Sequence, residues 1–150
     1  MSRVSFKGVI IGGIVDIGAT FVAAFPVGVY AFIVSGVSKL PQAQQAQALA
    51  DAMRNTPSVY IAGLLVGALC SVLGGYVAAR IARHDELLNG ALSSFLCVAT
   101  GLYAVARGTQ GTPPWVHVLL LIISPLLGAL GAYLRLRGRK STTDAMPTPA

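Results

Sequence analysis

The stretch GVIIGGIVDIGATFVAAFPVGVYAFIVSGV, residues 8–37, decides the fold of this chain, because its thirty residues carry a single charge, Asp16. A helix of that length reaches ~45 Å at ~1.5 Å per residue, which exceeds the ~30 Å hydrocarbon core of a bilayer. Arg3 and Lys7 precede the stretch as they would in a secretory leader, but the apolar cores of such leaders are only ~7–15 residues long. The stretch therefore predicts a retained membrane-spanning helix that is long enough to tilt.

The composition of the whole chain indicates that lipid is its solvent. Of the 150 residues, 55% are hydrophobic and 11% are charged, whereas soluble domains carry about 25% charged residues. The mean hydropathy is +0.72. The net charge of +6 does not predict a nucleic-acid partner, because the basic residues bracket the apolar segments as topology signals do.

Three further apolar blocks have about the length that a bilayer requires. With the first stretch they predict four transmembrane helices, over residues 8–37, 59–82, 87–106 and 115–134. Between the first two, residues 42–54 place small apolar side chains at helical spacing and predict a short amphipathic helix on the extracytoplasmic side. The fold class is therefore all-α, a four-helix transmembrane bundle in a single domain of residues 1–140. Residues 141–150 are expected to form a disordered cytoplasmic tail.

The distribution of lysine and arginine predicts the orientation of this bundle. Eight of these residues fall on the side of both termini and the second loop, and three fall on the other side. Cytoplasmic loops carry such an excess, so both termini are expected in the cytoplasm. The larger group contains Arg3, Lys7, Arg80, Arg83, Arg135, Arg137, Arg139 and Lys140, and the smaller contains Lys39, Arg54 and Arg107.

Small residues recur at every fourth position in the first two predicted spans. Such ladders let helix backbones approach closely, and in lipid this packing is a main source of helix association. Packing within one bundle is the ordinary interpretation, and a homo-oligomer face is the alternative. The packing positions expected from the ladders are Gly12, Gly63, Gly67, Ser71 and Gly75.

Asp16 lies on the first ladder, so its side chain is expected to face protein and not lipid. A charge at the bilayer centre costs about 2.5–3.5 kcal/mol on insertion scales, which makes such a residue a candidate functional site. Tyr76 and Ser94 are expected at a similar depth, and Arg80 is expected to lean toward that depth from the surface. Three hypotheses stay open: a hydrogen-bonded carboxyl that joins helices, an ion or proton site, and a contact with a partner subunit.

The other reactive side chains do not combine into a recognisable site. His84 and His117 fall on opposite sides of the predicted membrane, so they do not share a metal or haem. Cys70 and Cys97 lie inside apolar runs and are expected to be small packing residues. The sequence has no phosphate loop, nucleophile–base pair or metal motif, and it therefore predicts neither a cofactor nor an enzyme.

The second predicted hairpin, LGGYVAARIARHDELLNGALSS over residues 73–94, resembles uncharacterised small four-helix bacterial inner-membrane proteins. In that group a Gly-Gly-aromatic segment with a basic end leads through a short turn to a helix that contains glycine. The resemblance implies a multi-pass protein of a bacterial inner membrane, and it implies no activity. The turn here carries Asn89 and Gly90, and the predicted outer helix is not part of the group's pattern.

Two functions from different classes remain as hypotheses. The first is a structural or accessory membrane protein that works through helix contacts, with the bilayer and a second copy or a larger membrane complex as partners. The second is an oligomeric small transporter or channel that uses Asp16. The two differ in whether side chains seal Asp16 or a water-filled route reaches it.

Overall fold

The computed structural model describes residues 4–106 and 114–144. Regular structure in these two ranges is helical throughout, which confirms the all-α class. The elements are α1 (Phe6–Val34), the short 3₁₀ helix η1 (Val37–Lys39), α2 (Gln42–Asn55), α3 (Pro57–Ala82), α4 (Glu86–Ala106) and α5 (Pro114–Asp144).

The helix boundaries follow from local backbone chemistry. Ser5 caps α1, and its hydroxyl accepts a hydrogen bond from the Gly8 amide at 3.3 Å. Pro57 occupies the first turn of α3, where a backbone without an amide hydrogen is tolerated. Arg83 ends α3 in the left-handed conformation, with a φ of 58°. Glu86 then places a carboxylate in the first turn of α4, where the helix dipole favours it.

Two boundaries differ by more than two residues from those that the sequence predicts. The first helix is predicted to reach residue 37, whereas α1 ends at Val34 because Gly36 adopts a φ of 71° and begins η1. The last span is predicted to end at residue 134 and the tail to begin at residue 141, whereas α5 continues as helix to Asp144. Leucine, arginine and lysine follow residue 134, and these residues favour helix in water as well as in lipid.

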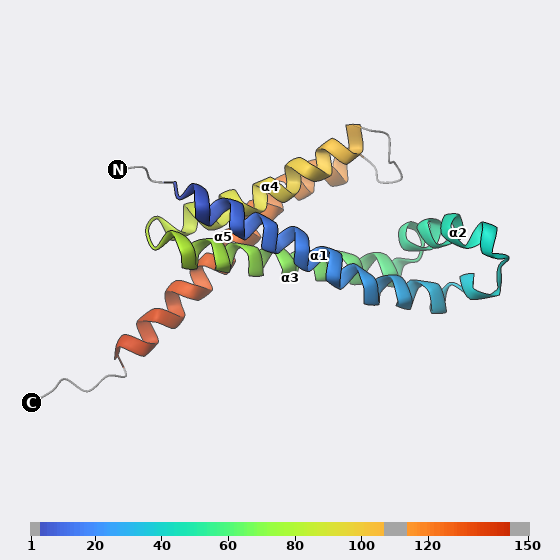
Figure 1. Ribbon diagram of the computed structural model, residues 1–150, viewed down its shortest axis with the longest axis horizontal. Coiled ribbons are helices and arrows are strands. Elements are labelled where there is room, and N and C mark those ends of the chain that lie inside the picture. Colours follow the sequence, from blue (N-terminus) through green and yellow to red (C-terminus); the bar gives the residue numbers. More distant parts are fainter. Residues whose placement is uncertain (1–3, 107–113, 145–150) are drawn as a thin grey trace, which may run out of the picture.

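Two helix pairs cross to make the bundle. α1 packs along α3 and α4 packs along α5, and the pairs meet where α3 contacts α4 and α5. Figure 1 shows the crossing: on one side of it, α1 and α3 diverge from α4, and on the other side α5 extends past the other helices. The crossing therefore brings four helices together over a short length only.

The helix α2 covers the end of the α1–α3 pair that lies away from the crossing (Figure 1). Leu49 of α2 and Val66 of α3 pack against a small buried cluster of Val27, Ala31 and Val59. The helix that the sequence predicts over residues 42–54, resting on the bundle, is confirmed by α2.

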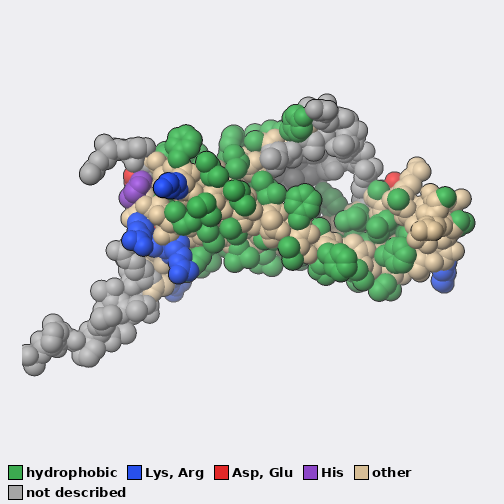
Figure 2. Space-filling view, viewed as in Figure 1, with side chains coloured by type: hydrophobic (Ala, Val, Ile, Leu, Met, Phe, Trp, Pro, Cys, Tyr) green, Lys and Arg blue, Asp and Glu red, His purple; other side chains and the backbone are tan. Residues whose placement is uncertain are grey.

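The side chains are distributed in the reverse of the arrangement typical of water-soluble proteins. The largest fully buried side chains are short or polar: Val59, Asn89, Asp16, Ser93 and Ser94. By contrast, Phe21 and Phe25 of α1 are 76% and 77% exposed, and Leu69 of α3 is 64% exposed. Hydrophobic side chains cover much of the face seen in Figure 2. By length and composition, α1 and α3 are able to cross a membrane.

Candidate functional site

A group of buried polar side chains lies where the four long helices meet, and we call it the polar cluster. Each of its members is at most 8% exposed, and together they come from α1, α3, α4 and α5. The members are Asp16, Ser71, Ser93, Ser94 and Ser124. Buried polar groups require hydrogen-bond partners, so the contacts within the cluster decide what it can do.

Asp16 is the one carboxyl of the cluster, and it has no exposed surface. The Ser71 hydroxyl of α3 lies 3.2 Å from one of its carboxylate oxygens and 3.4 Å from the other, and donates to them. The α3 backbone is equally close, because a Cβ added at Gly74 would lie 2.7 Å from the Asp16 Cβ. Asp16 therefore faces protein, as the sequence predicts, and its partner is a neutral hydroxyl group.

The serine hydroxyls continue the cluster across the other helices. The Ser94 hydroxyl of α4 donates to the Ser71 carbonyl at 3.5 Å, and the Ser124 hydroxyl of α5 donates to the Ser94 carbonyl at 3.2 Å. The Ser93 hydroxyl donates within α4, to the Gly90 carbonyl at 2.8 Å. These contacts join α3, α4 and α5 through buried hydrogen bonds, and Ser94, which is predicted at a depth similar to that of Asp16, takes part in two of them.

Arg80 and Tyr76 are not brought to Asp16. Both side chains are exposed, with Tyr76 at 38%, and the structure pairs Asp16 with no cation among the side chains that it describes. The physical reason is rotation about the helix axis. Arg80 follows Ser71 by nine residues, which is about 13 Å along α3 and about two and a half turns around it. Arg80 therefore lies on the face of α3 opposite to Ser71.

Pairs of glycines bring the helix backbones together around the polar cluster. A Cβ added at Gly12 would lie 2.7 Å from the Gly74 carbonyl oxygen, and one added at Gly74 would lie 2.8 Å from the Gly12 carbonyl oxygen. Gly90 and Gly128 approach each other in the same reciprocal way between α4 and α5. Gly75 meets Gly128 between α3 and α5, where an added Cβ would lie 2.6 Å from the Gly128 Cα. Only glycine permits backbones to approach this closely.

The predicted packing positions divide into two groups. Gly12, Ser71 and Gly75 lie at the crossing, as the ladder predicts, whereas a Cβ added at Gly63 or Gly67 meets no atom within 4 Å among the described residues. A four-residue step turns the ladder by about 40°, so the three steps from Gly63 to Gly75 turn it by about 120°. One ladder therefore cannot face one partner along its whole length. Contact of Gly63 and Gly67 with another chain stays a prediction.

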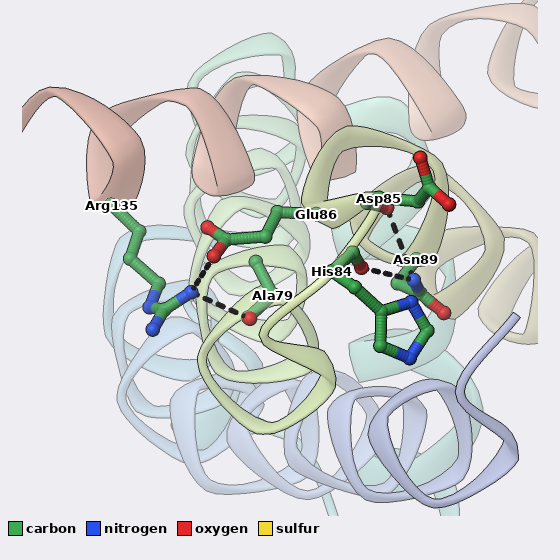
Figure 3. Close-up of polar contacts among 6 residues, drawn as sticks. All are labelled: Ala79, His84, Asp85, Glu86, Asn89 and Arg135. Atoms are coloured by element: carbon green, nitrogen blue, oxygen red, sulfur yellow. Dashed lines mark hydrogen bonds and ion pairs between the residues drawn. The ribbon is translucent and has the colours of Figure 1, made fainter. Parts of the chain in front are cut away.

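A second group of polar contacts joins the helix ends near the turn between α3 and α4, and we call it the turn network (Figure 3). Arg135 of α5 pairs with Glu86 at the start of α4 and donates to the Ala79 carbonyl of α3 at 2.7 Å. Asn89 donates to the carbonyls of His84 and Asp85, each at 3.0 Å. The network therefore fixes the turn to two neighbouring helices.

The Asn89 side chain also reaches the start of α1. Its amide oxygen accepts a hydrogen bond from the Ser5 backbone amide at 2.7 Å. Asn89 is fully buried, and one side chain thus holds the first residues of α1 against the turn between α3 and α4.

Sequence reasoning missed several of the residues that build these sites. Gly74 is adjacent to the predicted packing position Gly75. Gly90 and Gly128 are each four residues from a buried serine, Ser94 and Ser124, and Gly12 is likewise four residues from Asp16. That shared spacing is a usable signal. Asn89 and Arg135 carried weaker signals, because a polar residue near a helix end also fits a solvated turn.

Comparisons of this chain with known protein families, with curated proteins and with solved structures find no match. The resemblance of residues 73–94 to small bacterial inner-membrane proteins therefore stays a prediction.

Proposed function

We propose that this chain is a small integral membrane protein with four transmembrane helices, and that it works as a structural or accessory protein through helix contacts. The observation that carries the proposal is the reversed distribution of side chains, with phenylalanine and leucine outside and aspartate, asparagine and serine inside. A single chain in water would leave this apolar surface exposed, at about 25 cal/mol of lost stabilisation for each Å². Lipid removes that penalty, and helices satisfy their own backbone hydrogen bonds within it.

The burial of the two longest apolar helices supports lipid in preference to a soluble core. A core helix of a soluble protein is mostly buried, whereas 11% of the most apolar window of α1 and 28% of that of α3 are buried in this chain. The basic side chains add support for the orientation, because Lys7, Arg80 and Arg83 gather at one end of the bundle. On these grounds we place the chain in a bacterial inner membrane with both termini in the cytoplasm.

Two features support a role in helix contacts, one in the polar cluster and one on the outer face of α3. Asp16 has no exposed surface, and the backbone at Gly74 and the hydroxyl of Ser71 close over it. A hydrogen-bonded carboxyl between helices is a strong point of association in lipid. The open glycines Gly63 and Gly67 leave room on the outside of α3 for the backbone of a further helix.

Cysteine labelling in intact cells tests the transmembrane arrangement. In a background with Cys70→Ala and Cys97→Ala, single cysteines are introduced as Gln47→Cys in α2 and His84→Cys in the turn after α3, at two exposed positions. A membrane-impermeant maleimide should label Gln47→Cys and should label His84→Cys only after the cells are opened. Labelling of both positions in intact cells would show that α3 does not cross the membrane.

Substitution of a glycine on the outer face of α3 tests whether the chain works through contacts with a partner helix. Gly67→Ile should leave the fold intact but dissociate a complex isolated in mild detergent, whereas Leu65→Ile at a 62% exposed position should leave the complex unchanged. A chain that purifies alone in every mild detergent, with both variants equal to the parent, would contradict the accessory function.

A second candidate function is an ion or proton site at Asp16 in an oligomeric transporter or channel. The specific observation that favours it is a buried carboxyl bonded to the Ser71 hydroxyl, beside serine hydroxyl–carbonyl bonds that link α3, α4 and α5. Proton or cation flux into liposomes tests it. Parent protein should carry a flux that Asp16→Asn abolishes while the helix content is retained, and absence of flux in the parent would exclude this function.

A further inference from the structure

A groove of about 460 Å³ lies beside the turn network, where α3 ends and α4 begins against the side of α5. Its lining is Arg83, His84, Asp85, Glu86, Leu87, Leu88 and Leu136. The hydrogen bonds from Asn89 to the carbonyls of His84 and Asp85 hold the polar part of its lining in place. The turn that lines the groove is thus held by hydrogen bonds.

The lining of the groove combines two kinds of side chain. Arg83 and His84 are exposed at the turn, Leu87 and Leu88, at 47% and 44% exposed, follow in the first turn of α4, and Leu136 belongs to α5. A cation beside exposed leucines matches a molecule with an anionic head and an apolar chain. A free phosphate ion would use only the cation, and a neutral lipid would use only the leucines.

The charge balance around the groove favours an anion. Arg135 pairs with Glu86 and compensates its carboxylate, so Asp85 is the remaining acid of the lining. Basic residues outnumber the acids at this end, and Figure 2 shows them gathered there. Those with exposed side chains, which pair with no described carboxylate, are Lys7, Arg80, Arg83 and Arg137.

We propose that this groove binds one anionic phospholipid, with the headgroup phosphate beside Arg83 and an acyl chain along Leu87, Leu88 and Leu136. The inference rests on the proposed membrane location, because the groove then opens at the level where headgroups meet acyl chains. Basic pockets between transmembrane helices bind anionic headgroups in this way. The bound lipid would fill the groove between the turn after α3 and the side of α5.

Native mass spectrometry of protein released from lipid nanodiscs tests the site. The parent chain is placed in phosphatidylcholine discs that contain an increasing fraction of phosphatidylglycerol, and the lipids retained on each chain are counted. One phosphatidylglycerol should stay bound while phosphatidylcholine is lost. Arg83→Gln should weaken this retention about fivefold, since one basic residue near the surface is worth about a factor of five.

Three further variants test whether phosphatidylglycerol is retained by this groove or by general electrostatic attraction to the basic end of the bundle. Leu88→Ser should lower retention without changing the charge, and Asp85→Asn should raise it. Lys39→Gln removes an exposed lysine at the opposite end of the bundle and should leave retention unchanged. Equal losses in Arg83→Gln and Lys39→Gln, or equal retention of both lipids by the parent, would overturn the proposal.

The same nanodiscs distinguish a failure of the lipid site from a failure of the proposed membrane location. A chain that fails to enter discs of pure phosphatidylcholine contradicts the membrane location itself. A chain that enters those discs with its helix content intact, and shows no preference for phosphatidylglycerol, contradicts the lipid site alone.

Discussion

Gly75→Ala is a small change that tests the helix crossing, because it adds one methyl group where the backbones of α3 and α5 are in close contact. The added Cβ would lie 2.6 Å from the Gly128 Cα and 2.7 Å from the Gly128 carbonyl carbon, whereas ordinary contact begins at 3.4 Å. Both neighbouring atoms belong to the backbone, so no side-chain rotation relieves the contact. The nearest neighbour of the added Cβ is the Gly128 carbonyl oxygen, so the two helices must move apart by more than about 1 Å. A gap of about 0.5–1 Å already forfeits a quarter to a half of the dispersion energy across it.

The magnitude follows from comparison with a matched position on the same helix. Overpacking by one methyl group costs about 1–3 kcal/mol, and Gly75→Ala is expected in that range or above it. At Gly67, two turns earlier, an added Cβ meets nothing within 4 Å. Alanine favours helix over glycine by up to ~1 kcal/mol, so Gly67→Ala is expected to be neutral or stabilising. Gly75→Ala gains the same helix propensity, so the two variants should differ by the overpacking cost alone, about 1–3 kcal/mol.

Unfolding in mixed detergent micelles measures this difference. Helix content is followed by circular dichroism as the fraction of denaturing detergent rises, for the parent and both variants. Gly18→Ala is a second control, since that position on α1 is also open. If Gly75→Ala and Gly67→Ala unfold at the same detergent fraction, the close approach of α3 and α5 at Gly128 is refuted.

Three other predictions concern the polar contacts. Asp16→Asn should cost less than ~1 kcal/mol and Asp16→Leu about 1–3 kcal/mol in the same unfolding assay, because only leucine adds bulk against the α3 backbone; equal losses would contradict a neutral hydrogen-bonded role. Arg135→Met should cost about 3–5 kcal/mol by leaving the Glu86 carboxylate without its cation, and the double variant with Glu86→Gln should recover most of that loss. If the double variant is no more stable than Arg135→Met, the pair does not hold the turn. Asn89→Ala removes three hydrogen bonds worth about 0.5–1.5 kcal/mol each, and amide exchange at Ser5 should accelerate while exchange in α2 stays unchanged.

The elements of this fold were predictable because each is encoded locally. The helices are marked within a few residues, apart from the end of α5, by long apolar blocks, the prolines at residues 57 and 114 and the basic turn between α3 and α4. The inward position of Asp16 was predictable for a similar reason, since it shares a helix face with Gly12. Depth along a helix is readable from sequence by counting residues.

The crossing itself was not predictable from one sequence. Gly75 meets Gly128 because two helix pairs cross at a particular angle, and nothing in either segment alone specifies that angle. The predicted approach of Arg80 to Asp16 failed in both rise and rotation, because Arg80 lies about 13 Å along α3 from Ser71 and on the opposite face of the helix. Counting rotation together with rise would have excluded that pair.

The partnership of Asp16 with Ser71 also sets an order of events during synthesis. The two residues are 55 positions apart, so at about 5–20 residues per second the ribosome reaches Ser71 some ~3–11 s after Asp16. During that interval α1 exists without its partner helix, and its carboxyl depends on water, on a proton or on the insertion machinery for compensation. The serines of α4 and α5 emerge later still. A carboxyl with no exposed surface in the finished bundle is therefore synthesised several seconds before the residues that surround it.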